Sequence, residues 1–188
     1  MEKKERFVHD LSSLLVKHKI FTEREAKSFQ KSFKEAAQET FEEFLLDEGL
    51  IDKEDLLKAL SQYYKTPAID LAGYFFQTFL LRKFPKGFML RNIFVPLEVD
   101  QNFMIVAAGE PDNPDLLSII GKYVSYDIQF RCSIKQDIID AIREFYDKSD
   151  AEVAGELGIF GDYIDEDDIY RIASREEEYP EGLEEEEE

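Results

Sequence analysis

Two histidines, one cysteine and a short acidic run are the residues whose types could support catalysis or metal binding. His9 and His18 lie nine residues apart in segments of helical periodicity, and we interpret them as exposed helix histidines rather than as a metal pair. Cys132 is the single cysteine, so it can form neither an internal disulfide nor a cysteine-based zinc site. The acidic run 165–168 lacks the glycine and the ligand spacing of an EF-hand loop, and we interpret it as solvated charge.

A phosphate-binding loop is also missing from the sequence. Such a loop needs a glycine-rich turn followed by Lys and then Ser or Thr, whereas the nearest Gly-Lys pair, Gly121-Lys122, is followed by Tyr123 and has no upstream glycine. We therefore predict a protein that is not an enzyme, with no catalytic residue, no metal and no cofactor.

The charge is strongly acidic and unevenly spread. The chain has 188 residues, with 42 acidic and 23 basic residues and a net charge of −19. Sixteen of the acids lie in 151–188, which leaves 26 acidic and 21 basic residues in 1–150. Without a basic stripe, direct nucleic-acid binding is not expected. No apolar run approaches the ~20 residues that span a bilayer, and the N-terminus lacks the apolar region of a secretory signal, so we predict a cytoplasmic protein without direct membrane insertion.

Residues 1–66 have the pattern of a helical hairpin that occurs twice. A shift of 30 residues places Leu15 on Leu45 and Lys19 on Gly49, and each half has the order helix, turn, two apolar residues, N-cap, helix. The N-cap of the first half is Thr22, which forms a capping-box pattern with Glu25. A single unit of this kind cannot bury its apolar face, so the two copies should pack together.

After residue 66 the pattern becomes that of a small sheet. The run 103–108 is apolar on both faces and should be the central strand, while Pro96 predicts a strand end or an edge strand. A helix is expected at 75–84, stopped by Pro85 and Gly87; this Phe-rich run is an alternative docking surface, although core packing is the simpler interpretation. The expected strands are 92–97, 103–108 and 126–132, and the other helices are 115–121 and 133–146.

The predicted fold class is α+β. We expect a helical repeat at 1–66, a small α/β sandwich of order β-β-α-β-α at 67–148, and an acidic, mostly disordered tail at 149–188. The tail could mimic a polyanion, or it could simply keep the protein soluble.

The ordered set of these segments resembles the amino-terminal domain of type II secretion and type IV pilus assembly ATPases (the GspE/PilB group, with an MshEN-like domain). The segments that match are 41–60, 66–71, 81–85, 95–97, 105–113 and 138–146. The resemblance implies a non-catalytic domain that docks onto the cytoplasmic part of an inner-membrane platform protein and is recruited to the membrane face by that partner. The ATPase core is missing from this chain, which would be a separated region or a stand-alone relative.

Some members of that family bind cyclic di-GMP through an Arg-Leu-Gly motif at the start of each repeat. Here the matching positions are Asp10-Leu11-Ser12 and Thr40-Phe41-Glu42, so both arginines and both glycines are replaced. Docking through the exposed face of the repeat is therefore the leading hypothesis, with Glu42, Asp47 and Glu48 as candidate partner-binding residues. The alternative is a degenerate nucleotide-sensing regulator, for which Leu15, Leu45 and Gly49 are the ligand positions that the sequence retains.

Overall fold

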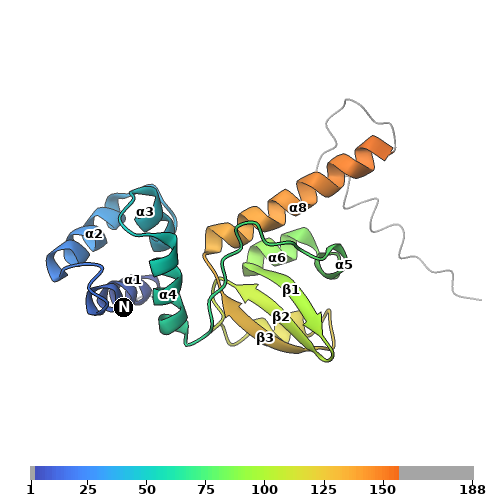
Figure 1. The fold of residues 1–188 in the computed structure, drawn as a ribbon, viewed down its shortest axis with the longest axis horizontal. Coiled ribbons are helices and arrows are strands. Elements are labelled where there is room, and N and C mark those ends of the chain that lie inside the picture. Colours follow the sequence, from blue (N-terminus) through green and yellow to red (C-terminus); the bar gives the residue numbers. More distant parts are fainter. Residues whose placement is uncertain (1–2, 157–188) are drawn as a thin grey trace, which may run out of the picture. The chain divides into compact units, whose positions relative to one another are not determined.

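The structure, a computed structural model, describes residues 3–156, with side chains as far as residue 146 (Figure 1). Residues 1–147 form one compact unit and residues 148–188 a second, of which only the end of the last helix is described. The predicted acidic tail therefore lies almost entirely outside the described residues. Among the residues described, no helix is long and apolar enough to cross a membrane.

Four helices form the first part of the chain, and the sequence explains where they begin. Thr22 caps the second helix through the predicted capping box, because its hydroxyl accepts the N–H of Glu25 at 3.2 Å while the Glu25 carboxylate accepts the N–H of Thr22 at 2.8 Å. Asp52 occupies the equivalent N-cap position of the fourth helix but makes no side-chain cap bond. The helices are α1 (Lys3–Lys17), α2 (Glu23–Glu35), α3 (Phe41–Asp47) and α4 (Lys53–Tyr64).

A three-stranded sheet and its helices form the second part. Strand β2 is central, as its apolar pattern predicts, with β1 antiparallel to it on one side and β3 parallel to it on the other. Pro96 lies on edge strand β1 next to a bulge, as expected for a residue that cannot donate to the ladder. The elements are α5 (Thr78–Leu81), α6 (Lys86–Asn92), β1 (Phe94–Asp100), β2 (Phe103–Ala108), α7 (Leu116–Ile120), β3 (Asp127–Cys132) and α8 (Lys135–Glu156).

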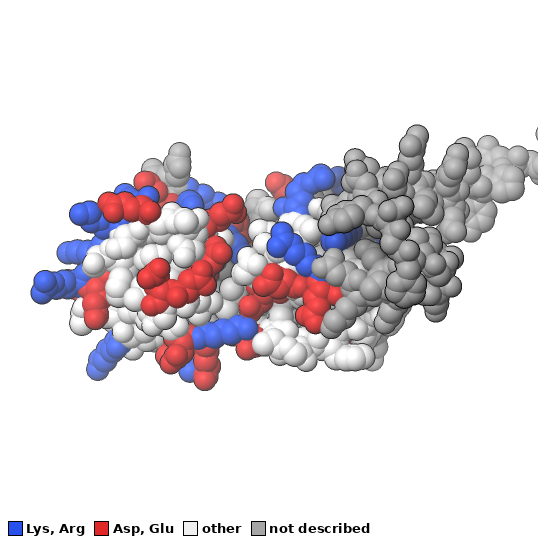
Figure 2. Space-filling model, turned by 90° about the horizontal axis from the view of Figure 1, so that it is seen from above, with Lys and Arg blue, Asp and Glu red and all other residues white. Residues whose placement is uncertain are grey.

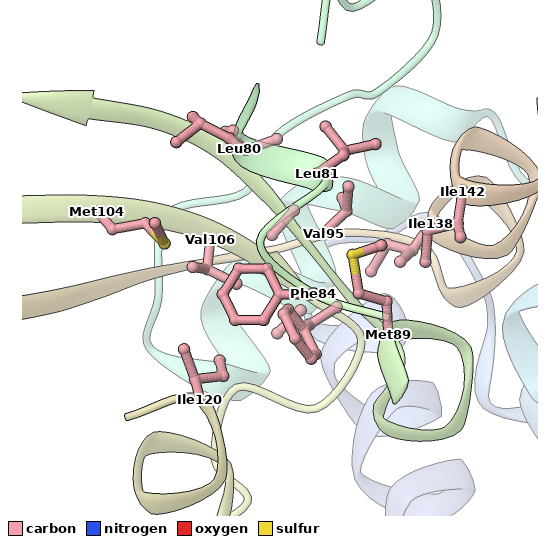
Figure 3. Packing of buried hydrophobic residues seen from close by; sticks show 14 of the residues in the cluster. Leu80, Leu81, Phe84, Met89, Val95, Met104, Val106, Ile120, Ile138 and Ile142 are labelled. Carbon is pink, nitrogen blue, oxygen red and sulfur yellow. The ribbon is translucent and has the colours of Figure 1, made fainter. Parts of the chain in front are cut away.

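The core of the sheet part lies between the strands and helices that are far apart in the sequence. Figure 3 shows Leu80 and Leu81 of α5 and Ile138 and Ile142 of α8 gathered with strand residues around Phe84. All of these side chains are essentially inaccessible to solvent. Burying one large aliphatic side chain contributes roughly 1.5–3 kcal/mol, so this cluster is the main stabilising feature of the sheet part.

The helical repeat is joined to the sheet through β3 and the segment after α4. Cys132, the last residue of β3, packs in the core of the helices, and its N–H donates to the carbonyl of Pro67 at 3.0 Å. Lys53 of α4 also binds two carboxylates, Asp70 at 2.6 Å and Asp137 of α8 at 2.9 Å. The α+β fold class is confirmed, whereas the boundary between separate parts at 66/67 stays a prediction.

The structure corrects three element boundaries. Pro85 and Gly87 do not stop a helix at 75–84: the helix there is only α5, and Pro85 is the N-cap of a second helix, α6, which sequence analysis missed. Proline is compatible with a helix start because the first N–H groups have no partner within the helix. The last helix begins at Lys135 rather than at Ser133, and it continues to Glu156, past the predicted start of the tail at 149.

Candidate functional site on the helical repeat

The turns between paired helices have the same backbone conformation in both copies of the repeat. Lys19 and Gly49, which the 30-residue shift places on each other, have φ of 62° and 63°. In each copy the next residue's N–H donates back to the first helix, to the carbonyl of Leu15 at 3.0 Å and of Leu45 at 2.9 Å. This agreement at a rarely occupied conformation supports a true repeat rather than two unrelated hairpins.

The first helix of each copy has a buried polar residue at the same repeat position. Ser12 is 1% exposed and Glu42 is 2% exposed. The Ser12 hydroxyl donates to the carbonyl of Val8 at 2.7 Å, while Thr40 accepts the N–H of Glu43 at 3.2 Å and caps α3. Ser12 and Glu42 stand where the resembling motif has glycine, so their side chains fill space that glycine would leave open.

Among the residues that the structure describes, no cation forms an ion pair with the Glu42 carboxyl. Burial raises the pKa of Glu42, and the positive charge of Lys135 acts in the opposite direction without cancelling the effect. The Lys135 ammonium already binds Glu110 at 2.6 Å, and Lys3 binds the other oxygen of Glu110 at 2.5 Å. Burial opposes ionisation of Glu110 as well, but its two lysine partners outweigh burial and hold its pKa below the usual value.

Aromatic rings pack beside the buried end of this charged cluster, while Lys3 and Glu110 remain accessible to solvent. Phe7 stacks on Tyr64 with ring centroids 6.2 Å apart, and the Lys135 ammonium lies 5.8 Å from the centroid of Phe7. Burial raises the pKa of Tyr64 far above its usual value, so its phenol stays protonated. A buried carboxyl with a raised pKa is common in active sites. At 2% exposure, however, Glu42 is not accessible to a substrate, and the arrangement serves packing rather than chemistry.

The candidate partner-binding residues divide into one buried and two exposed side chains. Asp47 and Glu48 are exposed at the C-terminal end of α3, where Asp47 accepts a long hydrogen bond of 3.4 Å from Gln38. Glu42 is not on that surface, because it belongs to the buried side of α3. The docking face predicted from sequence therefore keeps Asp47 and Glu48 and loses Glu42.

The positions retained for the nucleotide-sensing alternative have structural roles. Leu15 and Leu45 are fully buried in the helical core, and Gly49 provides the positive φ of its turn. Packing and backbone geometry would preserve these residues without any ligand. Their presence therefore does not favour a binding site.

The other candidate residues are scattered. His9 lies 3.0 Å from Asp10, and His18 lies 2.7 Å from Gln62. Burial raises the pKa of the Cys132 thiol to about 11. Among the side chains that the structure describes, in residues 3–146, no three His, Cys, Asp or Glu come together as a metal site, and the run 165–168 lies outside the described residues.

The Phe-rich run contributes to both the core and the surface. Leu80 and Leu81 are buried, whereas Phe75 is 91% exposed and Phe79 is 59% exposed. The sequence pattern allows both a core and a docking role for the run, and the structure assigns its members to different environments. A local signal was available, since the run lies in a stretch without any acidic residue, 71–97.

Comparisons with known proteins agree with this architecture. Residues 64–152 match the sequence model of the MshEN domain family. Among solved structures, MshE with cdg aligns with a TM-score of 0.56 at 18% identity, over 72% of this chain and 98% of that chain. Two crystal forms of the N-terminal domain of XpsE align with TM-scores of 0.49 and 0.42, at 11% and 12% identity, each over 76% of this chain and over 96% and 98% of theirs. No curated protein matches the chain. The resemblance to the amino-terminal domains of secretion and pilus ATPases is confirmed.

Proposed function

We propose, from the match of residues 64–152 to the MshEN domain model, that the chain is a non-enzymatic docking and regulatory domain that acts by protein–protein contact. Its partner is the cytoplasmic part of an inner-membrane secretion or pilus platform protein. The protein acts in the cytoplasm and reaches the membrane face through that partner. These 188 residues contain no phosphate-binding loop, so the proposed role of this region does not include nucleotide hydrolysis.

The burial of Ser12 and Glu42 is the observation that supports docking over nucleotide sensing. Cyclic di-GMP is an anion, and the resembling motif would meet it with arginine side chains and open glycine backbone. This chain has Asp10 and Thr40 at the arginine positions, and the two buried side chains fill the glycine positions. The carboxylate of Asp10 would repel an anionic ligand, and the side chains of Ser12 and Glu42 occupy the volume that glycine would leave open to it.

The docking face lies at the exposed end of α3. Asp47 and Glu48 are adjacent there, and no basic side chain in the described residues forms an ion pair with either of them. Figure 2 shows acidic and basic side chains interspersed over the helices, so recognition would depend on local charge pairs rather than on one continuous field. A basic patch on the partner would pair with these carboxylates and speed the encounter.

The test combines capture with a matched pair of charge reversals. The full chain is used as bait in native extract, and binding of the recovered platform protein's cytoplasmic part is then measured by biolayer interferometry. Asp47→Lys/Glu48→Lys should weaken binding by about tenfold or more. Glu98→Lys/Asp100→Lys reverses two exposed acids on β1 and should leave binding unchanged. Failure to recover a platform protein, or equal effects of both variants, would contradict the proposal.

The second candidate function is cyclic di-GMP sensing, which is favoured by the similarity to MshE in a structure with cdg. A ligand present at 100 times its Kd stabilises the folded state by about 2.7 kcal/mol. Thermal unfolding with excess cyclic di-GMP therefore separates the two functions. We expect no rise in melting temperature, and a rise of several degrees would favour sensing instead.

A further inference from the structure

One stretch of this acidic chain contains no acidic residue. Residues 71–97 include Arg82, Lys83, Lys86 and Arg91 but neither Asp nor Glu. At the average acid content of the chain, about six acidic residues would fall in a stretch of this length. Its charge is therefore opposite to that of the chain as a whole.

Helix α5 brings exposed aromatic side chains to this positive stretch. Its Leu80 and Leu81 face the core, so Phe79 faces outward and is 59% exposed. The turn continues to Lys83, whose N–H donates to the carbonyl of Leu80 at 3.2 Å. Phe79 and Lys83 therefore belong to one short segment, α5 and the turn that follows it. Phe75, at 91%, is the most exposed large apolar side chain in the described residues.

A hollow adjoins this surface at Lys83. It has a volume of about 420 Å³ and is lined by Lys83, Lys122, Tyr123, Ser125 and Tyr126, together with Gly121 and Val124. Tyr123 is held in place by Phe88 and Phe84, at ring-centroid distances of 4.4 Å and 5.7 Å. No carboxylate lines the hollow, and neither lysine has an acidic partner within the described part of the chain. Two free ammonium groups thus meet at a hollow that also offers hydroxyl groups and aromatic surface.

We propose that this basic-aromatic surface (Phe75, Phe79, Lys83, Lys122 and Tyr123) binds an acidic peptide segment of a partner protein that contains large apolar side chains. Carboxylates of the peptide would bind Lys83 and Lys122 at the hollow. Its apolar side chains would cover Phe75 and Phe79, which would bury aromatic area that is now in water. This surface is separate from the acidic docking face of α3, so the inference does not depend on the proposed function.

Charge decides between a peptide and a lipid surface. Exposed Phe beside Lys and Arg is also typical of proteins that bind anionic membranes. A bilayer, however, is an extended negative plane that would face much of a chain with net charge −19, whereas a short peptide meets only charges within a Debye length of about 8 Å. The same repulsion would penalise a bilayer more than a peptide.

Fluorescence anisotropy of a labelled peptide with the full chain tests the proposal. The probe is Asp-Glu-Asp-Phe-Glu-Asp-Leu-Phe-Asp-Glu carrying fluorescein, and the matched probe has its three apolar residues replaced by Ser. Lys83→Glu/Lys122→Glu and Phe75→Ser/Phe79→Ser should each weaken binding of the first probe by about tenfold or more. Lys27→Glu/Lys31→Glu, which reverses two exposed lysines on α2, should leave binding within about twofold.

The outcomes separate the alternatives. The proposal is supported if the first probe binds, if both surface variants weaken this binding, and if the serine probe does not bind. The affinity for the first probe should also fall between about 50 and 300 mM salt. Absence of binding, or equal weakening in the α2 variant, overturns it. Sedimentation with phosphatidylserine-containing vesicles, in place of peptide binding, would identify a membrane surface and would overturn it as well. Far-ultraviolet circular dichroism of each variant confirms that the fold is retained. Because no platform protein is used, a negative result here leaves the docking face on α3 unaffected.

Discussion

Replacement of Glu42 by Gln should stabilise the protein at neutral pH, which is the reverse of what loss of a native side chain usually does. Glu42 is 2% exposed and has no counter-ion of its own, because Lys135 is already bound to Glu110. Burial raises the pKa of Glu42 above its ordinary value of 4.5. Ionisation at neutral pH therefore costs free energy that a neutral isosteric amide does not incur.

The magnitude follows from the surroundings of the side chain. A buried polar group without full compensation costs about 1–3 kcal/mol in protein mutational data. Glu42 lies in the first turn of α3, where the helix dipole stabilises an ionised carboxylate by about 0.5 kcal/mol. The positive charge of Lys135 stabilises it by a similar amount. The expected net gain of Glu42→Gln is thus at most about 2 kcal/mol, and this upper limit corresponds to roughly 4–8 °C in melting temperature for a chain of this size.

The pH dependence gives the sharper test. The folded carboxyl holds its proton more tightly than the unfolded one. Its contribution to stability is thus fully present below the ordinary pKa and is lost as pH rises through the raised pKa of the folded state. The loss cannot exceed about 1.4 kcal/mol per pH unit for one proton. The difference in stability between Glu42→Gln and the wild type should therefore be near zero below the ordinary pKa and grow as pH rises through the raised pKa of the folded carboxyl.

Urea unfolding of both proteins across this pH range measures the difference directly. Glu48→Gln is the matched control, because Glu48 is exposed on the same helix and its substitution should change stability little at any pH. A difference for Glu42→Gln that is constant with pH would refute the raised pKa. A destabilised Glu42→Gln at neutral pH would show that attraction by Lys135 outweighs the cost of burial.

Three further predictions concern the turns, the joint and the thiol. Lys19→Gly should relieve a positive φ and stabilise the protein by about 0.5–1 kcal/mol, whereas Gly49→Ala at the equivalent turn should destabilise it by a similar amount in urea unfolding; equal signs would contradict the repeat. Lys53→Met should cost about 1–2 kcal/mol in the same assay, since it leaves Asp137 without its cation; no loss would show that the pair is neutral to stability. Cys132 should react with iodoacetamide at about pH 7.5 at least about 100-fold more slowly in the folded than in the urea-unfolded protein, and fast labelling of the folded protein would contradict its burial.

Features determined by neighbouring residues could be predicted from the sequence. The capping box at Thr22 and the central position of β2 follow from spacing and from apolar pattern, and both are confirmed. The helical repeat was visible because the same residue types recur after 30 positions, at Leu15 and Leu45 and at the turns. For the capping box and the strand, the residues that decide the structure lie within one helical turn or one strand of each other, and each copy of the repeat is likewise specified by its own local pattern.

Features that depend on distant partners were not predictable. Glu42 appeared to be a surface residue because glutamate is seldom fully buried, and only the packing of α3 on the other helices puts it inside. The local pattern predicts a helix stop at Pro85, but proline is also suited to a helix start, and here it caps α6, whose Met89 packs in the core of the sheet part. The exposure of Phe79 depends on which side of α5 faces the sheet, and the buried Leu80 and Leu81 occupy that side.

The residues that stabilise the fold of the repeat are not the residues that would contact a ligand. Similarity to the family in the first group therefore does not show that this chain binds the ligand. Leu15, Leu45 and Gly49 build the helical core and its turn, so any sequence with this fold must keep residues of their kind whether or not it binds a nucleotide. Only positions that face a ligand without stabilising the fold can distinguish the two cases. At the positions corresponding to the glycines of the motif, this chain has side chains that are themselves packed, Ser12 and Glu42. Substitution of Ser12 and Glu42 by glycine would open space in the buried core, and at position 42 it would also remove the carboxyl that lacks a compensating charge. Nucleotide binding and the stability of this repeat are therefore linked, and a chain that gained binding would also lose the pH dependence expected for Glu42.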